Sequence, residues 1–293
     1  MIPQGRFAFM ARLDFATWAP ERVVAALREL GYGGVSWMRQ HFHPRTHSAA
    51  QLRALMQVTA DGGLAVTEVV VQQDLVCLDE AVRRDRIVLV GEYIEAAAEV
   101  GRPLLNVFTG PAPWDPQAPR IPRDVSEGSA WDMVHEAYAH FVPLAEAKGV
   151  TLILEPVFGH LAHDYYTAME LLRRFPSPAL AINFDPSHLH LYRNDIPWVI
   201  RQWGSRIRHV HMKDAVGVPG MPGQEFLFPL LGEGSIEWPG VIRALDAVGY
   251  RGFYTVEFES FTFYRQVLRN DPVAAARLSM EALRKLIGEE RQG

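Results

Sequence analysis

Cysteine is almost absent from this sequence. Among 293 residues there is one cysteine, Cys77, so no disulfide can form within the chain. A lone cysteine of this kind is typical of a small buried apolar side chain. Long apolar runs are absent as well. Residues 82–101 come closest, but arginines and glutamates interrupt them, and a membrane helix needs about 18 consecutive apolar residues.

Basic charge is scarce relative to acidic charge. The chain has 29 lysines and arginines against 34 aspartates and glutamates, which gives a formal net charge of −5. Nucleic-acid-binding proteins usually carry a basic face, so we expect no nucleic-acid partner. The first 20 residues contain charged side chains and no apolar run, unlike a secretory signal peptide. We therefore expect a soluble cytoplasmic protein with no membrane partner.

Strand-like apolar stretches alternate with amphipathic, helix-like stretches along the chain. One helix is expected to begin at Pro20, to place Val23, Val24 and Leu27 on one side, and to end at Gly31. The eight expected strands cover residues 7–13, 34–38, 64–71, 104–109, 150–156, 180–185, 207–213 and 253–259. Strands that alternate with helices in this way form a parallel sheet.

A parallel sheet of this size can stay open or close into a barrel. No Gly-x-Gly-x-x-Gly follows the first expected strand, so an open dinucleotide-binding sheet has no support. The expected helix-to-strand connections are short and marked by glycine or proline. The strand-to-helix connections are long and cover residues 110–129, 157–166, 214–238 and 260–270. Because TIM barrels build their function from strand-to-helix loops, we predict an α/β fold, a single-domain (β/α)8 TIM barrel over residues 1–293.

Four of the expected strands in the second half carry polar residues at every second position. Glu155, Asp185, His211 and Glu257 lie at or near the carboxyl ends of these strands, all on the same face. Burying carboxylates on a strand is energetically costly unless a positive charge neutralises them. In a closed barrel, inward-facing residues at the strand ends converge on one point. Glu68 has the same inward parity on the third strand and has no assigned role.

Three carboxylates and one imidazole make a ligand set that consists mostly of oxygen. Such a set suits Mn²⁺, Mg²⁺ or Co²⁺, whereas structural zinc sites more often contain cysteine or several histidines. We predict one bound divalent metal ion, with Mn²⁺ as the leading candidate. Its predicted ligands are Glu155, Asp185, His211 and Glu257.

The motifs around these positions resemble those of the xylose isomerase-like TIM barrels, the superfamily of sugar phosphate isomerases and epimerases. The motifs are Leu-Glu155-Pro, Asn-Phe-Asp185-Pro-Ser-His188, His209-Val-His211-Met-Lys213-Asp214 and Val-Glu257-Phe-Glu. By this resemblance the same four residues are the metal ligands, and His188 contacts the substrate. The likeness extends over nearly the whole chain, and it implies a metal-dependent enzyme of carbohydrate metabolism that acts on a small-molecule sugar.

The residue types fit that chemistry. Isomerising or epimerising a keto sugar requires removal of a proton beside the carbonyl, and a metal ion stabilises the enolate oxygen that develops. A carboxylate can take the proton and return it. We therefore predict a sugar isomerase or epimerase acting on a keto sugar or a related polyol ketone, with Glu155 and Glu257 as catalytic groups on opposite faces of the carbon. Lys213, His160 and Trp114 are further candidates for substrate contacts.

Several alternatives stay open at this point. The Lys213-Asp214 pair also occurs in the inosose dehydratase branch, whose lyases share the enolate step and then expel water. The same barrel occurs in AP endonucleases of DNA repair, which need several zinc ions, more histidines and a basic face. Lys213 can also form an ion pair with Asp214. Aromatic residues of the long loops, including Trp114 and Phe226, suit either a sugar face or a subunit interface, so a homodimer or homotetramer remains an alternative.

Overall fold

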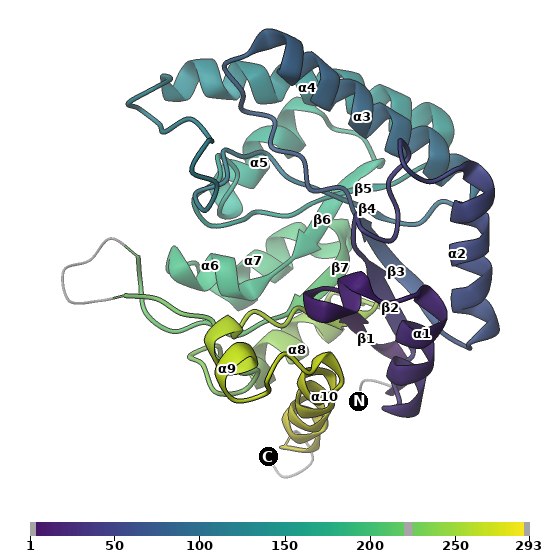
Figure 1. Ribbon diagram of the computed structural model, residues 1–293. Coiled ribbons are helices and arrows are strands. Elements are labelled where there is room, and N and C mark those ends of the chain that lie inside the picture. The colour runs from purple at the N-terminus through teal and green to yellow at the C-terminus, as the bar shows by residue number, and fades with distance from the viewer. Residues whose placement is uncertain (1–3, 220–224, 290–293) are drawn as a thin grey trace.

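Eight short strands pair side by side in sequence order, and the last strand pairs with the first to close the sheet. The computed structural model describes residues 4–219 and 225–289, and its centre is this closed parallel barrel (Figure 1). The strands are β1 (Phe7–Met10), β2 (Gly34–Trp37), β3 (Ala65–Val70), β4 (Leu105–Val107), β5 (Leu152–Leu154), β6 (Leu180–Phe184), β7 (Ile207–Met212) and β8 (Tyr254–Val256). The predicted TIM barrel is confirmed.

Helices follow the strands and surround the barrel (Figure 1). They are α1 (Pro20–Glu29), α2 (Ala49–Asp61), α3 (Glu80–Glu99), α4 (Glu127–Lys148), α5 (Tyr165–Arg174), α6 (Pro186–Leu191), α7 (Ile196–Trp203), α8 (Trp238–Ala247), α9 (Phe261–Gln266) and α10 (Pro272–Glu289). Three short 3-10 turns are η1 (Gln4–Arg6), η2 (Leu13–Thr17) and η3 (Gly204–Arg206). Within the described residues, no helix is long and apolar enough to cross a membrane.

The two ends of the described chain lie close together and complete the helical ring. Helix α10 packs against α8 and α1 (Figure 1). The Tyr32 hydroxyl, just after α1, donates a hydrogen bond of 2.8 Å to the Ala276 carbonyl in α10. As the sequence predicts, α1 begins at Pro20, and Gly31 after it has a positive φ of 90° that favours glycine.

The strand faces divide the barrel into two environments. Residues such as Leu154 and Phe184 face outward and are fully buried against the helices. Several inward-facing residues are polar and equally buried: Asn183 is 0% exposed and His209 is 1% exposed. A buried polar layer of this kind must satisfy its hydrogen bonds internally, because water cannot reach it.

The strands end earlier than the sequence pattern suggests. Strands β5, β6 and β8 end at Leu154, Phe184 and Val256, so Glu155, Asp185 and Glu257 each follow the last residue of a strand. The three acidic residues therefore lie at the rim, where the chain leaves the sheet. The connection expected over residues 260–270 contains a short helix, α9, and so is not wholly irregular.

The long connection after β7 is held by one aspartate. The Asp214 carboxylate accepts hydrogen bonds from the backbone N–H of Gly232 at 3.0 Å and from Nε1 of Trp238 at 2.9 Å. It also accepts from the N–H of Ile236 at 3.3 Å. Asp214, which follows β7 by two residues, thus ties the end of the connection to its beginning. Residues 220–224 of this connection lie outside the described part of the chain.

Candidate active site

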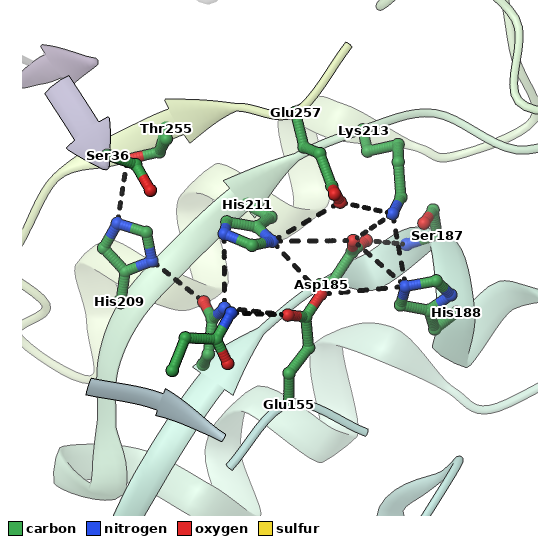
Figure 2. A network of polar contacts seen from close by, with 12 residues as sticks. Ser36, Glu155, Asp185, Ser187, His188, His209, His211, Lys213, Thr255 and Glu257 are labelled. Carbon is green, nitrogen blue, oxygen red and sulfur yellow. Dashed lines mark hydrogen bonds and ion pairs between the residues drawn. The ribbon is translucent and has the colours of Figure 1, made fainter. Parts of the chain in front are cut away.

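Four acidic or imidazole side chains meet at the carboxyl end of the barrel (Figure 2). One potential ligand atom from each of Glu155, Asp185, His188 and Glu257 lies within 4.8 Å of the others. We call these four residues the rim cluster. Asp185 caps α6, because its Oδ1 accepts a 2.8 Å hydrogen bond from the Ser187 N–H. Its other oxygen, Oδ2, lies 3.5 Å from His188 Nε2.

His211 of β7 reaches the rim cluster from below. Its Nδ1 lies 3.1 Å from Glu155 Oε1, 3.6 Å from Glu257 Oε2 and 3.9 Å from Asp185 Oδ2. Burial lowers the pKa of His211, but the carboxylates of Glu155 and Glu68 outweigh burial and raise the pKa well above its ordinary value. The structure therefore brings together all four residues that the sequence nominates as ligands, and it adds His188.

Glu155 is held by amides. Its Oε2 accepts hydrogen bonds from Nδ2 of Asn106 at 2.7 Å and from Nδ2 of Asn183 at 3.2 Å. Burial raises the pKa of Glu155; His211 opposes the rise, and the carboxylates of Glu257 and Asp185 add to it. A carboxylate whose pKa is raised in this way is suited to carry a proton as well as to take one.

Lys213 lies among the carboxylates of the rim. Its Nζ is 2.9 Å from Asp185 Oδ2, 2.5 Å from Glu257 Oε2 and 3.2 Å from Glu259 Oε2. Burial lowers the pKa of Lys213, but these three carboxylates raise it well above its ordinary value, so the amine stays charged. The suggested pairing with Asp214 is wrong, because Asp214 is occupied by the N–H groups of its own loop.

Arg12, directly beyond β1, supplies a second cation. Its Nη1 lies 2.6 Å from Oε1 of both Glu257 and Glu259. Burial raises the pKa of Glu259, but Lys213 and Arg12 outweigh burial and lower it. Side-chain exposure rises from 0% at Asp185 to 12% at Glu257 and 20% at Arg12. The site is therefore most accessible on the side of β8 and β1.

A second group of potential ligands lies one layer deeper. Ligand atoms of Glu68, His209 and His211 lie within 4.8 Å of one another, and all three residues are buried. We call these residues the inner cluster; His211 belongs to it and also faces the rim. Burial raises the pKa of Glu68, but His209, His211 and the hydrogen bonds from His211 and Ser36 lower it to about 2.

Aromatic side chains cover one flank of the rim. Phe158 stacks on His188 with ring centroids 5.6 Å apart, and Lys213 Nζ lies 4.9 Å from the centre of the Phe228 ring. Trp114 packs against Phe158 at 5.7 Å and against His160 at 5.3 Å, and it is 54% exposed. The structure thus connects the two nominated residues His160 and Trp114 to the rim cluster through Phe158.

His160 is a buried neutral side chain. Its Nδ1 accepts a 3.2 Å hydrogen bond from the Gly110 N–H, and its Nε2 has no hydrogen-bond partner among the described residues. Burial lowers the pKa of His160 to about 3.

The sequence pattern missed three residues that shape the site. Asn106 lies at inward parity on the expected strand over residues 104–109, and Arg12 lies at the end of the first expected strand. The positions of both residues on expected strands could have identified them as candidates. Phe158 carried no such signal, because it belongs to an irregular connection whose path the sequence does not determine.

The rim cluster has the donors that a divalent cation needs. Three carboxylates and an imidazole converge, and hard divalent ions prefer oxygen ligands with at most a few imidazoles. Asp185 Oδ2 is buried and accepts no directed hydrogen bond within the described chain, although the Lys213 ammonium lies near it. A buried carboxylate oxygen that accepts no directed hydrogen bond still has lone pairs with which it could bind a metal ion.

Comparison with known proteins bears on the fold and the family of the chain. The model of a protein family described as "Xylose isomerase-like TIM barrel" matches residues 24–286. A 2-oxo-tetronate isomerase of Pectobacterium atrosepticum is 25% identical over 243 residues, which cover 80% of this chain and 84% of the relative. An inosose dehydratase of Geobacillus thermodenitrificans is 29% identical over 140 residues, covering 44% of this chain and 47% of the relative. A solved L-ribulose 3-epimerase shares the fold with a TM-score of 0.72 and 20% identity, over 98% of this chain and 96% of that chain.

Proposed function

Because the chain belongs to the xylose isomerase-like TIM barrel family, we propose that it is a divalent-metal-dependent isomerase or epimerase of a keto sugar or a related polyol ketone. The observation that carries this proposal is the rim cluster. Figure 2 shows Glu257 and Glu155 pointing toward each other across the cluster; they follow β8 and β5 in the chain. Two carboxylates in this arrangement can address opposite faces of one substrate carbon.

Glu155, Asp185, His211 and Glu257 would hold one ion, Mn²⁺ first and Mg²⁺ or Co²⁺ as alternatives. When bound, such an ion polarises a substrate carbonyl and stabilises negative charge on its oxygen. The contacts of His211 Nδ1 with Glu155, at 3.1 Å, and with Glu257, at 3.6 Å, support its membership of this set. His188 is near enough to complete the set or to contact the substrate instead.

The two glutamates would handle the proton beside the carbonyl. Each is fixed in place by its neighbours: Asn106 and Asn183 hold Glu155, while Arg12 and Lys213 contact the two oxygens of Glu257. A general base must be held within hydrogen-bond reach of the proton that it removes. One glutamate takes the proton from one face of the carbon, and the other returns a proton to the opposite face, which inverts the centre.

The surroundings of the site favour an uncharged sugar. The two cations nearest the rim cluster, Arg12 and Lys213, already form ion pairs with Glu257 and Glu259. These carboxylates neutralise the positive charge of both side chains and so weaken their attraction for a phosphate group. Trp114 offers an apolar ring for the C–H face of a sugar, and Lys213 and His188 offer polar contacts for its hydroxyl groups.

The test is a panel of free ketoses and inososes incubated with the Mn²⁺-loaded protein in deuterium oxide. NMR would follow product formation and deuterium uptake at the carbon beside the carbonyl. We expect an isomer or epimer that carries deuterium at that carbon. Absence of turnover and of exchange across the panel, with the ion bound, would refute the proposal.

An inosose-type dehydratase is the second candidate. The relative from Geobacillus thermodenitrificans carries that name. The charged Lys213 lies 3.2 Å from His188 Nε2, so two groups near the carboxylates could assist departure of a hydroxyl group. The same panel separates the candidates, because a dehydratase product is lighter than its substrate by one water. The carboxylate-rich rim cluster disfavours an AP-endonuclease-like site, which needs more histidine ligands.

A further inference from the structure

The inner cluster has the composition of a second metal site but the hydrogen bonds of a finished network. His209 uses both ring nitrogens: Nδ1 contacts Asn183 Oδ1 at 2.9 Å, and Nε2 contacts Thr255 Oγ1 at 2.8 Å. Glu68 Oε1 accepts from Ser36 Oγ at 2.7 Å and lies 2.8 Å from His211 Nε2. A cation here would have to displace these bonds, so the inner cluster serves another purpose.

The partners of His211 determine which of its nitrogens faces the rim. A carboxylate only accepts hydrogen bonds, so the 2.8 Å contact with Glu68 places a proton of His211 on Nε2, and the 3.1 Å contact with Glu155 places a second proton on Nδ1 while no ion is bound. The amide nitrogen of Asn183 lies 3.2 Å from His211 Nε2 and also donates to Glu155 and Glu68, at 3.2 and 3.4 Å; because it is a donor, it does not compete with Glu68 for the Nε2 proton. An ion bound at the rim would replace the Nδ1 proton, because Nδ1 faces Glu155 and the rest of the rim cluster, while the Nε2 proton would stay hydrogen-bonded to Glu68.

We propose that Glu68 is a positioning residue for the metal centre: by accepting the Nε2–H of His211, it fixes the ring orientation and presents Nδ1 to the ion. A ligating histidine commonly donates its second N–H to a carboxylate, which fixes the tautomer and strengthens the ligand. Ser36 donates a hydrogen bond to the same oxygen of Glu68 and so fixes its orientation. A chain of hydrogen bonds therefore runs from Ser36 on β2 through Glu68 on β3 to His211 on β7. This inference rests on the proposed role of His211 as a ligand.

The variant Glu68→Gln tests the role because it keeps the size of the side chain. One amide oxygen can still accept from His211, but the amide nitrogen then faces Asn183 and the Nδ1 of His209, which lies 3.4 Å from Glu68 Oε2. We expect the affinity for Mn²⁺, measured by calorimetry without substrate, to fall by about 10- to 100-fold, the usual effect of losing such a partner. The matched control is Ser36→Ala, which removes a bond to the same oxygen and leaves the carboxylate; its affinity should fall less.

A second measurement does not depend on any variant. In wild-type protein with ¹⁵N-labelled histidine and bound Mg²⁺, NMR should show His211 protonated at Nε2 and unprotonated at Nδ1. A proton on Nδ1 would overturn the proposal, even if Glu68→Gln fails to fold. A folded Glu68→Gln protein with unchanged Mn²⁺ affinity would overturn it as well. Both readouts are made without sugar, so failure to convert any sugar would refute the proposed function and leave this inference standing.

Discussion

The rim cluster and the inner cluster contain the same kinds of side chain, and they differ in how completely those side chains are paired. In the inner cluster, every contact of His209 joins a donor to an acceptor. In the rim cluster, several carboxylates surround Lys213 and Arg12, and Asp185 Oδ2 is left without a directed hydrogen bond in the described chain. Ligand chemistry alone therefore does not identify a metal centre.

Burial adds to this contrast. The inner cluster is sealed in the barrel, with Glu68 at 0% exposure, whereas Glu257 at the rim is 12% exposed. A catalytic ion must be reached by substrate, and only the rim offers that access. In the proposed function, unused ligand capacity together with access distinguishes the rim as the metal-binding layer, and the satisfied layer beneath it has the proposed positioning role.

Loss of a rim ligand should have the largest effect. Asp185→Ala removes the oxygen with unused capacity, and we expect loss of the bound ion and of all activity. The matched control is Asp195→Ala, because Asp195 also caps a helix, accepting from the Trp198 N–H at 3.0 Å, but belongs to neither cluster. That control should lose about 1 kcal/mol of stability and keep its ion. Metal analysis of both purified proteins checks the prediction, and full occupancy in Asp185→Ala would contradict it.

The next largest effect concerns the proton. Glu155→Gln and Glu257→Gln keep the side-chain shape but remove the basic oxygen, so each should lower kcat by about a hundredfold or more. Solvent deuterium exchange at the reacting carbon should slow most in the variant that lacks the abstracting base. Ion content is measured in parallel. If both variants keep the ion and exchange at the wild-type rate, the two-carboxylate mechanism fails, and His188 or Lys213 becomes the better candidate.

A smaller effect should appear in the dependence of stability on pH. His160 has a folded pKa of about 3, below the unfolded value of about 6.5. Between these values the unfolded chain binds a proton that the folded chain does not, so stability falls as pH falls below about 6.5. At pH 5 the loss from His160 amounts to roughly 2 kcal/mol relative to pH 7.

The variant His160→Gln isolates this contribution. Denaturant unfolding of wild type and variant at pH 7 and pH 5 should show a smaller pH-dependent loss in the variant. An equal loss in both proteins would mean that His160 does not stay neutral in the folded protein.

The smallest effect is expected at the aromatic flank. Trp114→Ala should raise KM for the sugar about two- to tenfold, because an aromatic contact contributes roughly 0.5–1.5 kcal/mol. Stability should change little, since Trp114 is 54% exposed. Tyr166→Ala is the control, because Tyr166 is 67% exposed and its ring contacts only Tyr165 among the described aromatic pairs. An unchanged KM together with a changed oligomeric state would instead support a subunit interface.

Much of the fold was accessible from the sequence because period-two patterns and glycine-marked turns are local properties. All eight strands lie where the pattern places them. The convergence of Glu155, Asp185 and Glu257 also followed, since barrel closure brings equivalent strand ends together. The alternation of polar and apolar residues along β3 was enough to predict that Glu68 faces inward. Its hydrogen bond with His211 depends on the relative heights of β3 and β7 across the barrel, and the alternation pattern contains no information about those heights.

Other parts of the site depend on geometry beyond the strands. His188 joins the rim cluster because Asp185 caps α6 and His188 follows three residues later, on the side of the helix that faces back to the rim. Phe158 reaches His188 from an irregular loop. The pairing of Lys213 with Glu257 was missed because Asp214, its sequence neighbour, looked like a suitable partner.

The contrast between the two clusters can be tested in a single experiment. Crystals grown with Mn²⁺ would be measured for anomalous scattering at the manganese edge. The predicted result is one peak per chain among Glu155, Asp185 and Glu257, in contact with Nδ1 of His211. A peak between Glu68 and His209, or a rim without any ion at saturating Mn²⁺, would contradict the assignment of the rim cluster as the metal centre.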